Sequence, residues 1–120
     1  MPDVPRDFAV YLDEDRAMVD REIRPRVTRE IVDEHRRDPF GKHSDALQVV
    51  LHYLRKHHLL LDGKAVVICT RPDEEWCLGE LTGVRGQPPR VDRSVGYRSR
   101  AEAEHAVFRK RLHALGLWEE

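Results

Sequence analysis

The run Ala65-Val66-Val67-Ile68-Cys69 is the point at which this 120-residue sequence changes from a helical to an extended hydrophobic pattern. Its three central residues are β-branched, which favours a short strand buried on both faces or nearly so. Arg71-Pro72-Asp73-Glu74-Glu75 has the composition of a turn, and residues 76–82 and 91–97 each predict a further strand. One face of the last strand is expected to carry Val91, Val95 and Tyr97. The short connections favour an antiparallel meander.

A long helix is predicted directly after the third strand. Ser99-Arg100-Ala101-Glu102 has capping-box spacing, in which the serine caps the first-turn amides and the glutamate reaches back. Gly116 is a natural residue for the end of this helix. Its broad apolar face consists of Ala103, Ala106, Val107, Phe108, Leu112 and Leu115.

Three more helices are predicted before the strands. Ser44 is a good cap for a helix over residues 45–58, in which leucine and valine recur at helical spacing. Upstream, the apolar pattern predicts helices over 13–24 and 26–37 that meet at a kink, because Pro25 removes a backbone donor. Asp38-Pro39-Phe40-Gly41 ends the second of these helices.

This order predicts an α+β fold with N-terminal helices, a three-stranded antiparallel sheet and a C-terminal helix packed on the sheet. We expect a single domain over residues 1–120, with a helical N-terminal arm (1–43) and a core of helix, three strands and helix (44–120). The last helix can cover one face of the sheet, so the charged N-terminal helices need another surface.

Composition excludes several classes of protein. Charged residues make up 36% of the chain, yet the formal net charge is only -1, so the whole molecule has no strong attraction to nucleic acid or to an acidic surface. Two cysteines, Cys69 and Cys77, are too few for a disulfide framework and are favoured as small core residues, although they could also face each other. No apolar stretch is long enough to span a bilayer, and the first seven residues do not resemble a signal peptide. A cytoplasmic location is expected.

The sequence offers no set of residues for catalysis, cofactor binding or metal binding. Within the predicted helices, His52 and His57 are five residues apart and His105 and His113 are eight apart, whereas ligands on one helix face need spacings of three or four. There is no Gly-x-Ser-x-Gly nucleophile motif and no phosphate-binding loop, and the carboxylates of the first helices are typical of a solvated face. The seven histidines are His35, His43, His52, His57, His58, His105 and His113.

Aromatic side chains outside the predicted elements point instead to an interface. Phe8 and Tyr11 precede the first helix, Phe40 lies in a turn, and Trp118 follows the last helix. Such residues can insert into a partner surface, although each one alone is more often a satellite of its own core.

Several motifs in this chain resemble the small subunit of bacterial N,N-dimethylformamidase, over roughly residues 29–112. The Pro-Phe-Gly turn and the His-Ala-Val-Phe helix are the most specific of them. The first group is Ile31-Val32-Asp33-Glu34-His35, Asp38-Pro39-Phe40-Gly41, His43-Ser44 and Tyr53-Leu54-Arg55. The second is Glu75-Trp76, Tyr97-Arg98-Ser99, Glu102-Ala103-Glu104-His105-Ala106-Val107-Phe108 and Arg111.

The resemblance implies a heteromeric enzyme that hydrolyses formamides to formate and an amine. In that family the large subunit carries a mononuclear iron and the catalytic groups, and the small subunit is needed for an assembled, active complex. No catalytic residue of the family falls on this chain, so we expect an accessory subunit present in equal numbers with its large partner. The candidate interface residues are Phe8, Tyr11, Pro39, Phe40, His43 and Trp118.

Two alternatives stay open at this stage. Three antiparallel strands followed by a helix also resemble DNA-binding modules whose sheet enters the major groove, with Trp76 packed on sugar or base. The contacting side chains would then be Arg85, Arg90, Arg93, Arg98 and Arg100. The near-neutral charge argues against this reading. A free-standing enzyme is the other alternative, and it would require turnover that is lost when His43 or His105 is replaced.

Overall fold

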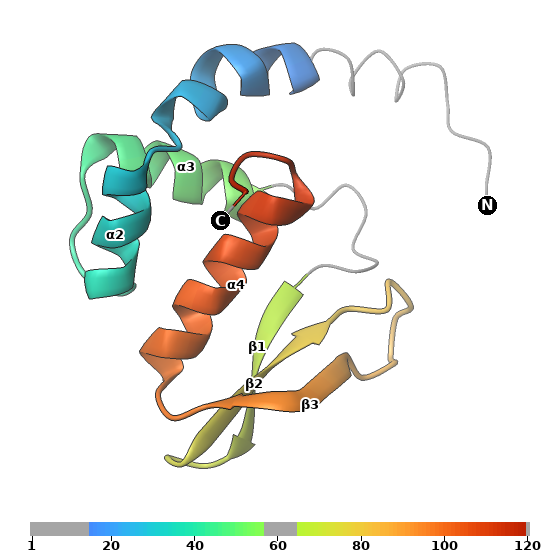
Figure 1. Cartoon of the computed structure of the whole chain (residues 1–120). Coiled ribbons are helices and arrows are strands. Elements are labelled where there is room, and N and C mark those ends of the chain that lie inside the picture. Colours follow the sequence, from blue (N-terminus) through green and yellow to red (C-terminus); the bar gives the residue numbers. More distant parts are fainter. Residues whose placement is uncertain (1–14, 57–64, 120) are drawn as a thin grey trace.

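The computed structural model describes residues 15–56 and 65–119, and it confirms the predicted α+β fold (Figure 1). Three strands form one antiparallel sheet in the order β1-β2-β3, and the C-terminal helix α4 contacts them. The helices are η1 (Val19–Ile23), η2 (Arg24–Arg26), α2 (Arg29–Arg37), α3 (Asp45–Lys56) and α4 (Arg100–Ala114). The strands are β1 (Ala65–Arg71), β2 (Glu75–Glu80) and β3 (Arg90–Tyr97).

The break between the first two helices lies further along the chain than the position of Pro25 predicts. Residues 15–18 are α-helical and continue through the π-helical η1 into the 3-10 turn η2, which contains Pro25. The chain then extends at Val27 and Thr28, and the Thr28 hydroxyl caps α2 by accepting from the Ile31 amide at 3.4 Å. The prediction that the second helix begins at residue 26 is therefore wrong, because Pro25 is tolerated near the start of a helical turn and the threonine cap sets the start of α2.

The serine cap and the C-terminal glycine of α4 form as the sequence predicts, but among the described residues the Glu102 side chain makes no bond back to Ser99. Ser99 caps the first turn by accepting from the Glu102 amide at 3.1 Å. At the other end Gly116 adopts a φ of 67°, and the Leu117 amide donates to the Leu112 carbonyl at 2.9 Å. This is a Schellman motif, which turns Leu117 back onto the core beside Leu112. Ser44 likewise caps α3 through the Leu47 amide, while residues 57–58 of the predicted helix lie outside the described residues.

The sheet is less buried than its apolar sequence suggests. Ile68 pairs with Cys77 and Cys69 pairs with Trp76, so the two cysteines point to opposite faces, with Cys77 buried and Cys69 exposed. Core packing was the favoured prediction for both thiols, and it holds for Cys77 alone. The prediction that β1 is buried on both faces is also wrong, because Ala65 is its single buried residue and α4 is the described helix that packs on the strands.

Strand β3 contains an irregularity that the sequence pattern did not reveal. Leu78 pairs with Asp92 but Trp76 pairs with Tyr97, so β3 has extra residues opposite Cys77. The Asp92 carboxylate accepts from the Ser94 amide at 2.9 Å within this bulge. As a result Val91 and Tyr97 point to opposite faces, contrary to the prediction that they share one, and Val95 is exposed.

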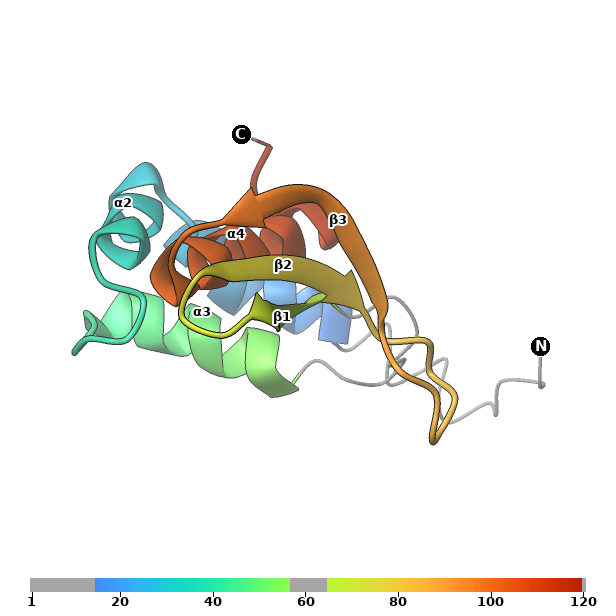
Figure 2. The ribbon, with the colours of Figure 1, turned by 90° about the horizontal axis from the view of Figure 1, so that it is seen from below.

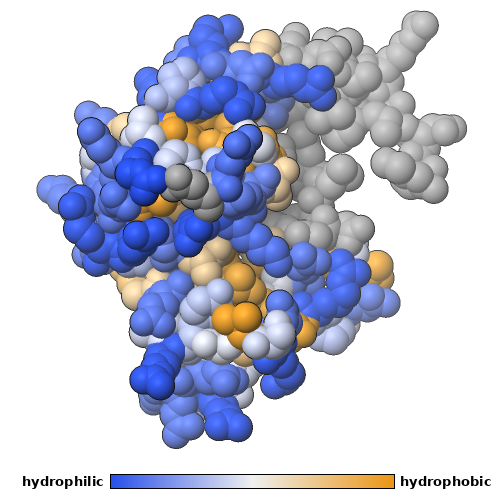
Figure 3. All heavy atoms as spheres, viewed as in Figure 1, coloured by the Kyte–Doolittle hydropathy of each residue, from blue (hydrophilic) through white to orange (hydrophobic). Residues whose placement is uncertain are grey.

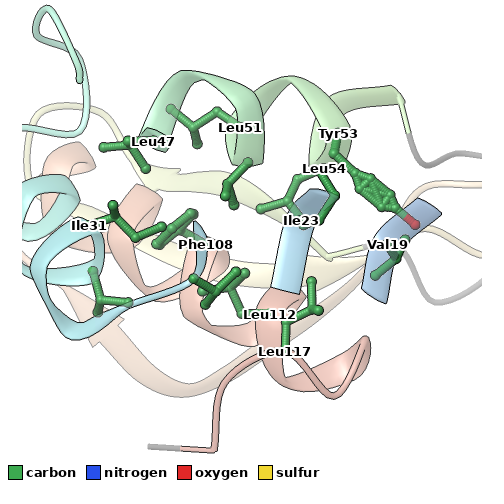
Figure 4. Packing of buried hydrophobic residues seen from close by; sticks show 13 residues of the cluster. Val19, Ile23, Ile31, Leu47, Leu51, Tyr53, Leu54, Phe108, Leu112 and Leu117 are labelled. Atoms are coloured by element: carbon green, nitrogen blue, oxygen red, sulfur yellow. The ribbon is translucent and has the colours of Figure 1, made fainter. Parts of the chain in front are cut away.

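The main hydrophobic core lies among the helices (Figure 4), and Ala65, Cys77, Ala103 and Val107 are buried outside it on the strands and α4. It joins apolar residues of 19–32 to α3, α4 and Leu117, and its most deeply buried members are Leu47, Val50 and Leu112. Helix α4 therefore lies between two layers, with the other helices on one side and the sheet on the other (Figures 1 and 2). The charged N-terminal helices pack against α3 and α4.

Candidate partner interface

The turn between α2 and α3, residues 38–44, is held by hydrogen bonds at both of its ends; we call it the Phe40 turn. The Asp38 carboxylate accepts from the Phe40 amide at 3.1 Å, and His43 Nε2 donates to the Asp38 carbonyl at 2.8 Å. A side chain at Gly41 would collide with the Asp38 carboxylate, which would then have to shift from its place beside the Phe40 amide. These contacts fix the first half of the turn.

A second set of contacts fixes the junction with α3. The Glu34 carboxylate accepts from the Ser44 amide at 2.7 Å and from the Ser44 hydroxyl at 2.6 Å, and these bonds hold the pKa of Glu34 below its usual value. Gln48 Nε2 donates to the His43 carbonyl at 2.7 Å. The Phe40 turn is therefore tied to both helices that it joins, which limits the entropy that it can lose on binding.

The side chain at the tip of this turn faces solvent. Phe40 is 57% exposed, although its neighbour Pro39 is buried. The Arg100 guanidinium lies 5.3 Å from the centre of the Phe40 ring, so the first turn of α4 supports one ring face through a cation–π contact. A held, exposed aromatic side chain of this kind is typical of an interface anchor.

A cleft of about 230 Å³ opens beside Phe40, between α2, α3 and α4; we call it the arginine cleft. Its apolar lining residues are Pro39, Phe40, Leu51, Leu54, Val107 and Phe108. Its polar lining residues are His35, Arg55, Arg100, Glu104 and Arg111. On the face shown in Figure 3, apolar residues reach the surface in separate patches among hydrophilic ones.

The three arginines of the cleft are only partly neutralised. Arg100 Nε lies 3.6 Å from Glu104 Oε1, whereas Arg55 and Arg111 form no ion pair within residues 15–56 and 65–119. Arg111 Nη2 donates to the Ala65 carbonyl at 2.9 Å, but its buried Nε has no hydrogen-bond partner among the described residues. Burial lowers the pKa of Arg111, the Glu104 carboxylate partly offsets this shift, and the nearby Arg55 charge adds to it. Its guanidinium still stays protonated at neutral pH.

Two histidines meet beneath the cleft. His35 of α2 and His105 of α4 are both buried, their Nδ1 atoms are 2.9 Å apart, and the His35 ring stacks on Phe108 at 4.1 Å between ring centres. One Nδ1 must donate and the other accept, so this bond forms when both rings are neutral. The buried Nε2 of His105 has no hydrogen-bond partner among the described residues. Burial is the main reason that the pKa of each histidine falls to about 4.

Comparison with known protein families shows the family of this chain. The family model for the N,N-dimethylformamidase alpha subunit matches residues 9–120. The chain belongs to this family. The match confirms the resemblance predicted from the motifs, and being an alpha subunit implies a partner subunit of dimethylformamidase. A search of the curated proteins found no match to the chain.

The predicted interface residues of this alpha subunit do not all gather in one place. Pro39, Phe40 and the half-buried His43 share the Phe40 turn. Trp118 lies beyond the opposite end of α4, packed partly buried against the hydrophobic core, with the Arg29 guanidinium 6.0 Å from its ring centre. Phe8 and Tyr11 lie outside the described residues. The role of all six predicted residues in a partner interface stays a prediction.

The residues of the DNA-binding alternative lie on β2, on β3 and on the segments that flank β3. Arg85 and Arg93 are exposed on the β2–β3 loop and β3, while Arg90 lies 3.6 Å from the Glu80 carboxylate and Trp76 is half-buried.

Within residues 15–56 and 65–119, no three histidine, cysteine or acidic side chains are arranged to hold a metal ion. None of the helices in the same residues is both long and apolar enough to cross a membrane.

The histidine pair and the arginine cleft were missed from sequence because their members come from different elements. His35 and His105 are 70 positions apart, and the spacing of histidines within a single helix cannot indicate a contact between two helices. One signal was available, because each histidine falls on the apolar side of its predicted helix, beside Ile31 and Val32 or beside Phe108.

Proposed function

We propose that this alpha subunit is a non-catalytic partner that assembles and stabilises the large subunit of a dimethylformamidase-like amidohydrolase. The iron and the catalytic groups belong to the large subunit, the two chains are present in equal numbers, and the complex works in the cytoplasm. The Phe40 turn is the observation that carries the proposal, because it holds an aromatic side chain in solvent by a network of hydrogen bonds.

The energetics of the Phe40 turn favour docking. Fully burying a phenylalanine side chain contributes about 1.5–3 kcal/mol. Phe40 is 57% exposed in the alpha subunit, so more than half of its surface can still be buried by a partner. Because Glu34, Asp38 and Gln48 already fix the turn, little conformational entropy is lost when a partner covers it.

The titratable groups near the turn support a non-catalytic role. His35 and His105 hydrogen-bond to each other and are only 4% and 8% exposed, so neither ring is freely accessible to a substrate. Cys77, on β2, is also buried. A general base or nucleophile needs access to the reacting atom, which these three groups lack, and the accessible Glu34 carboxylate is already hydrogen-bonded to Ser44.

The test is reconstitution with the large subunit that co-purifies with this chain. Amide hydrolysis is expected from the mixture and not from the alpha subunit alone. Phe40→Ala should raise the Kd of the complex about 10- to 100-fold, as for a hot-spot aromatic residue. Val84→Ala is the matched control, because Val84 is 55% exposed on the β2–β3 loop, and it should leave the Kd unchanged.

Three results would contradict the proposal. The alpha subunit could hydrolyse an amide by itself, the large subunit could be fully stable and active without it, or the chain could bind DNA with a steep salt dependence.

A further inference from the structure

The arginine cleft carries more positive charge than its own residues neutralise. Arg55, Arg100 and Arg111 face one carboxylate, Glu104, and His35 is neutral at pH 7, so the lining has a net charge of +2. Clustered guanidinium groups repel each other, and the buried Nε of Arg111 has no hydrogen-bond partner in the described part of the chain. An anionic group in the cleft would offset both costs.

We propose that the arginine cleft receives an aspartate or glutamate side chain of the partner subunit, presented beside the surface that covers Phe40. The inference rests on the proposed function and names the chemistry of the contact. Guanidinium groups hold carboxylates through paired, charge-assisted hydrogen bonds, and three of them converge here from α3 and α4.

The size and lining of the cleft favour a side chain over a larger ligand. Its volume of about 230 Å³ is below the roughly 300–1,000 Å³ of small-molecule pockets. Leu51, Leu54 and Val107 give it apolar walls suited to the methylene stem of an acidic residue. Phe40 lines the same cleft, so one partner segment can cover the ring and place a carboxylate among the arginines.

The experiment removes charge from the cleft without disturbing the fold. Arg55 and Arg100 are exposed, so the double variant Arg55→Gln/Arg100→Gln should fold normally, which circular dichroism checks. Arg55→Gln alone is measured beside it, because Arg100 also contacts the Phe40 ring. Arg111 is left intact because it binds the Ala65 carbonyl. The matched control, Arg85→Gln/Arg93→Gln, loses the same charge from the β2–β3 loop and β3, where both arginines are exposed.

The Kd for the purified large subunit is measured for each variant at several salt concentrations. The cleft variant should bind about 10- to 100-fold more weakly, with a shallower dependence of log Kd on log salt, and the control should change less than about threefold. An acidic residue of the partner whose replacement by arginine restores binding to Arg55→Glu would identify the carboxylate.

The outcomes separate the two proposals. If Phe40→Ala weakens binding but the cleft variant behaves like its control, the carboxylate inference is wrong and the proposed function stands. If the unaltered chain does not bind the large subunit, the proposed function fails and the inference fails with it.

Discussion

Two aromatic residues lie near opposite ends of α4, and they differ in how they are packed. Near the first turn of α4, Phe40 is held in solvent by a turn that is hydrogen-bonded to α2 and α3. Beyond the last turn, the Schellman motif at Gly116 turns the chain back, and Trp118 packs against the core. The sequence marks both as aromatic residues outside regular elements, but the local hydrogen bonds decide which one is available to a partner.

The largest expected effect is on the free energy of unfolding, and it concerns the C-terminal end of α4, which packs in the hydrophobic core. Leu112 is completely buried and packs with Leu117, so Leu112→Ala should destabilise the fold by about 2–5 kcal/mol through lost burial and a cavity. Phe40→Ala should change the free energy of unfolding by less than about 0.5 kcal/mol, because more than half of that side chain is already exposed. Urea unfolding of the two variants measures the contrast, and equal losses of stability would abolish the distinction between the two ends.

A smaller effect concerns the histidine pair that joins α2 to α4 beneath the Phe40 turn. The pKa of each histidine is about 4 in the folded chain and near 6.5 when unfolded, so the unfolded state binds more protons between these values. Stability should therefore fall by about 2–4 kcal/mol between pH 7 and pH 5. The charged or titratable groups nearest the pair are Asp33, Glu34, Arg36, His43, Arg55 and Arg109.

The pH dependence has a matched control. His35→Leu/His105→Leu should flatten the fall in stability between pH 7 and pH 5, whereas His52→Asn, at an exposed position of α3, should keep it. A slope that is unchanged in the double variant would assign the effect to other groups.

The features that the sequence predicts correctly depend on residues that are close together in the chain. The Ser44 and Ser99 caps, the Gly116 end and the three strands each depend on a few adjacent side chains, and all of them form. The start of α2 was misplaced because Pro25 is the stronger local signal, although Thr28 provides the cap. The β3 bulge escaped prediction because it depends on pairing with β2.

The candidate site was only partly predictable. The Asp38-Pro39-Phe40-Gly41 motif located the turn and its exposed ring. The arginine cleft requires Arg55, Arg100 and Arg111 to converge from α3 and α4, and the histidine pair requires α2 to lie against α4. Such contacts depend on how the helices pack, and no alternation or helical period within a single segment encodes them.

The most direct test of the central claim is amide hydrogen exchange of the alpha subunit, free and bound to its large subunit. The amides of the Phe40 turn and of the first turn of α4 should gain protection in the complex, while those of residues 115–119 should exchange at unchanged rates. Protection that appears at residues 115–119 or along β3 and is absent from the Phe40 turn would contradict the account.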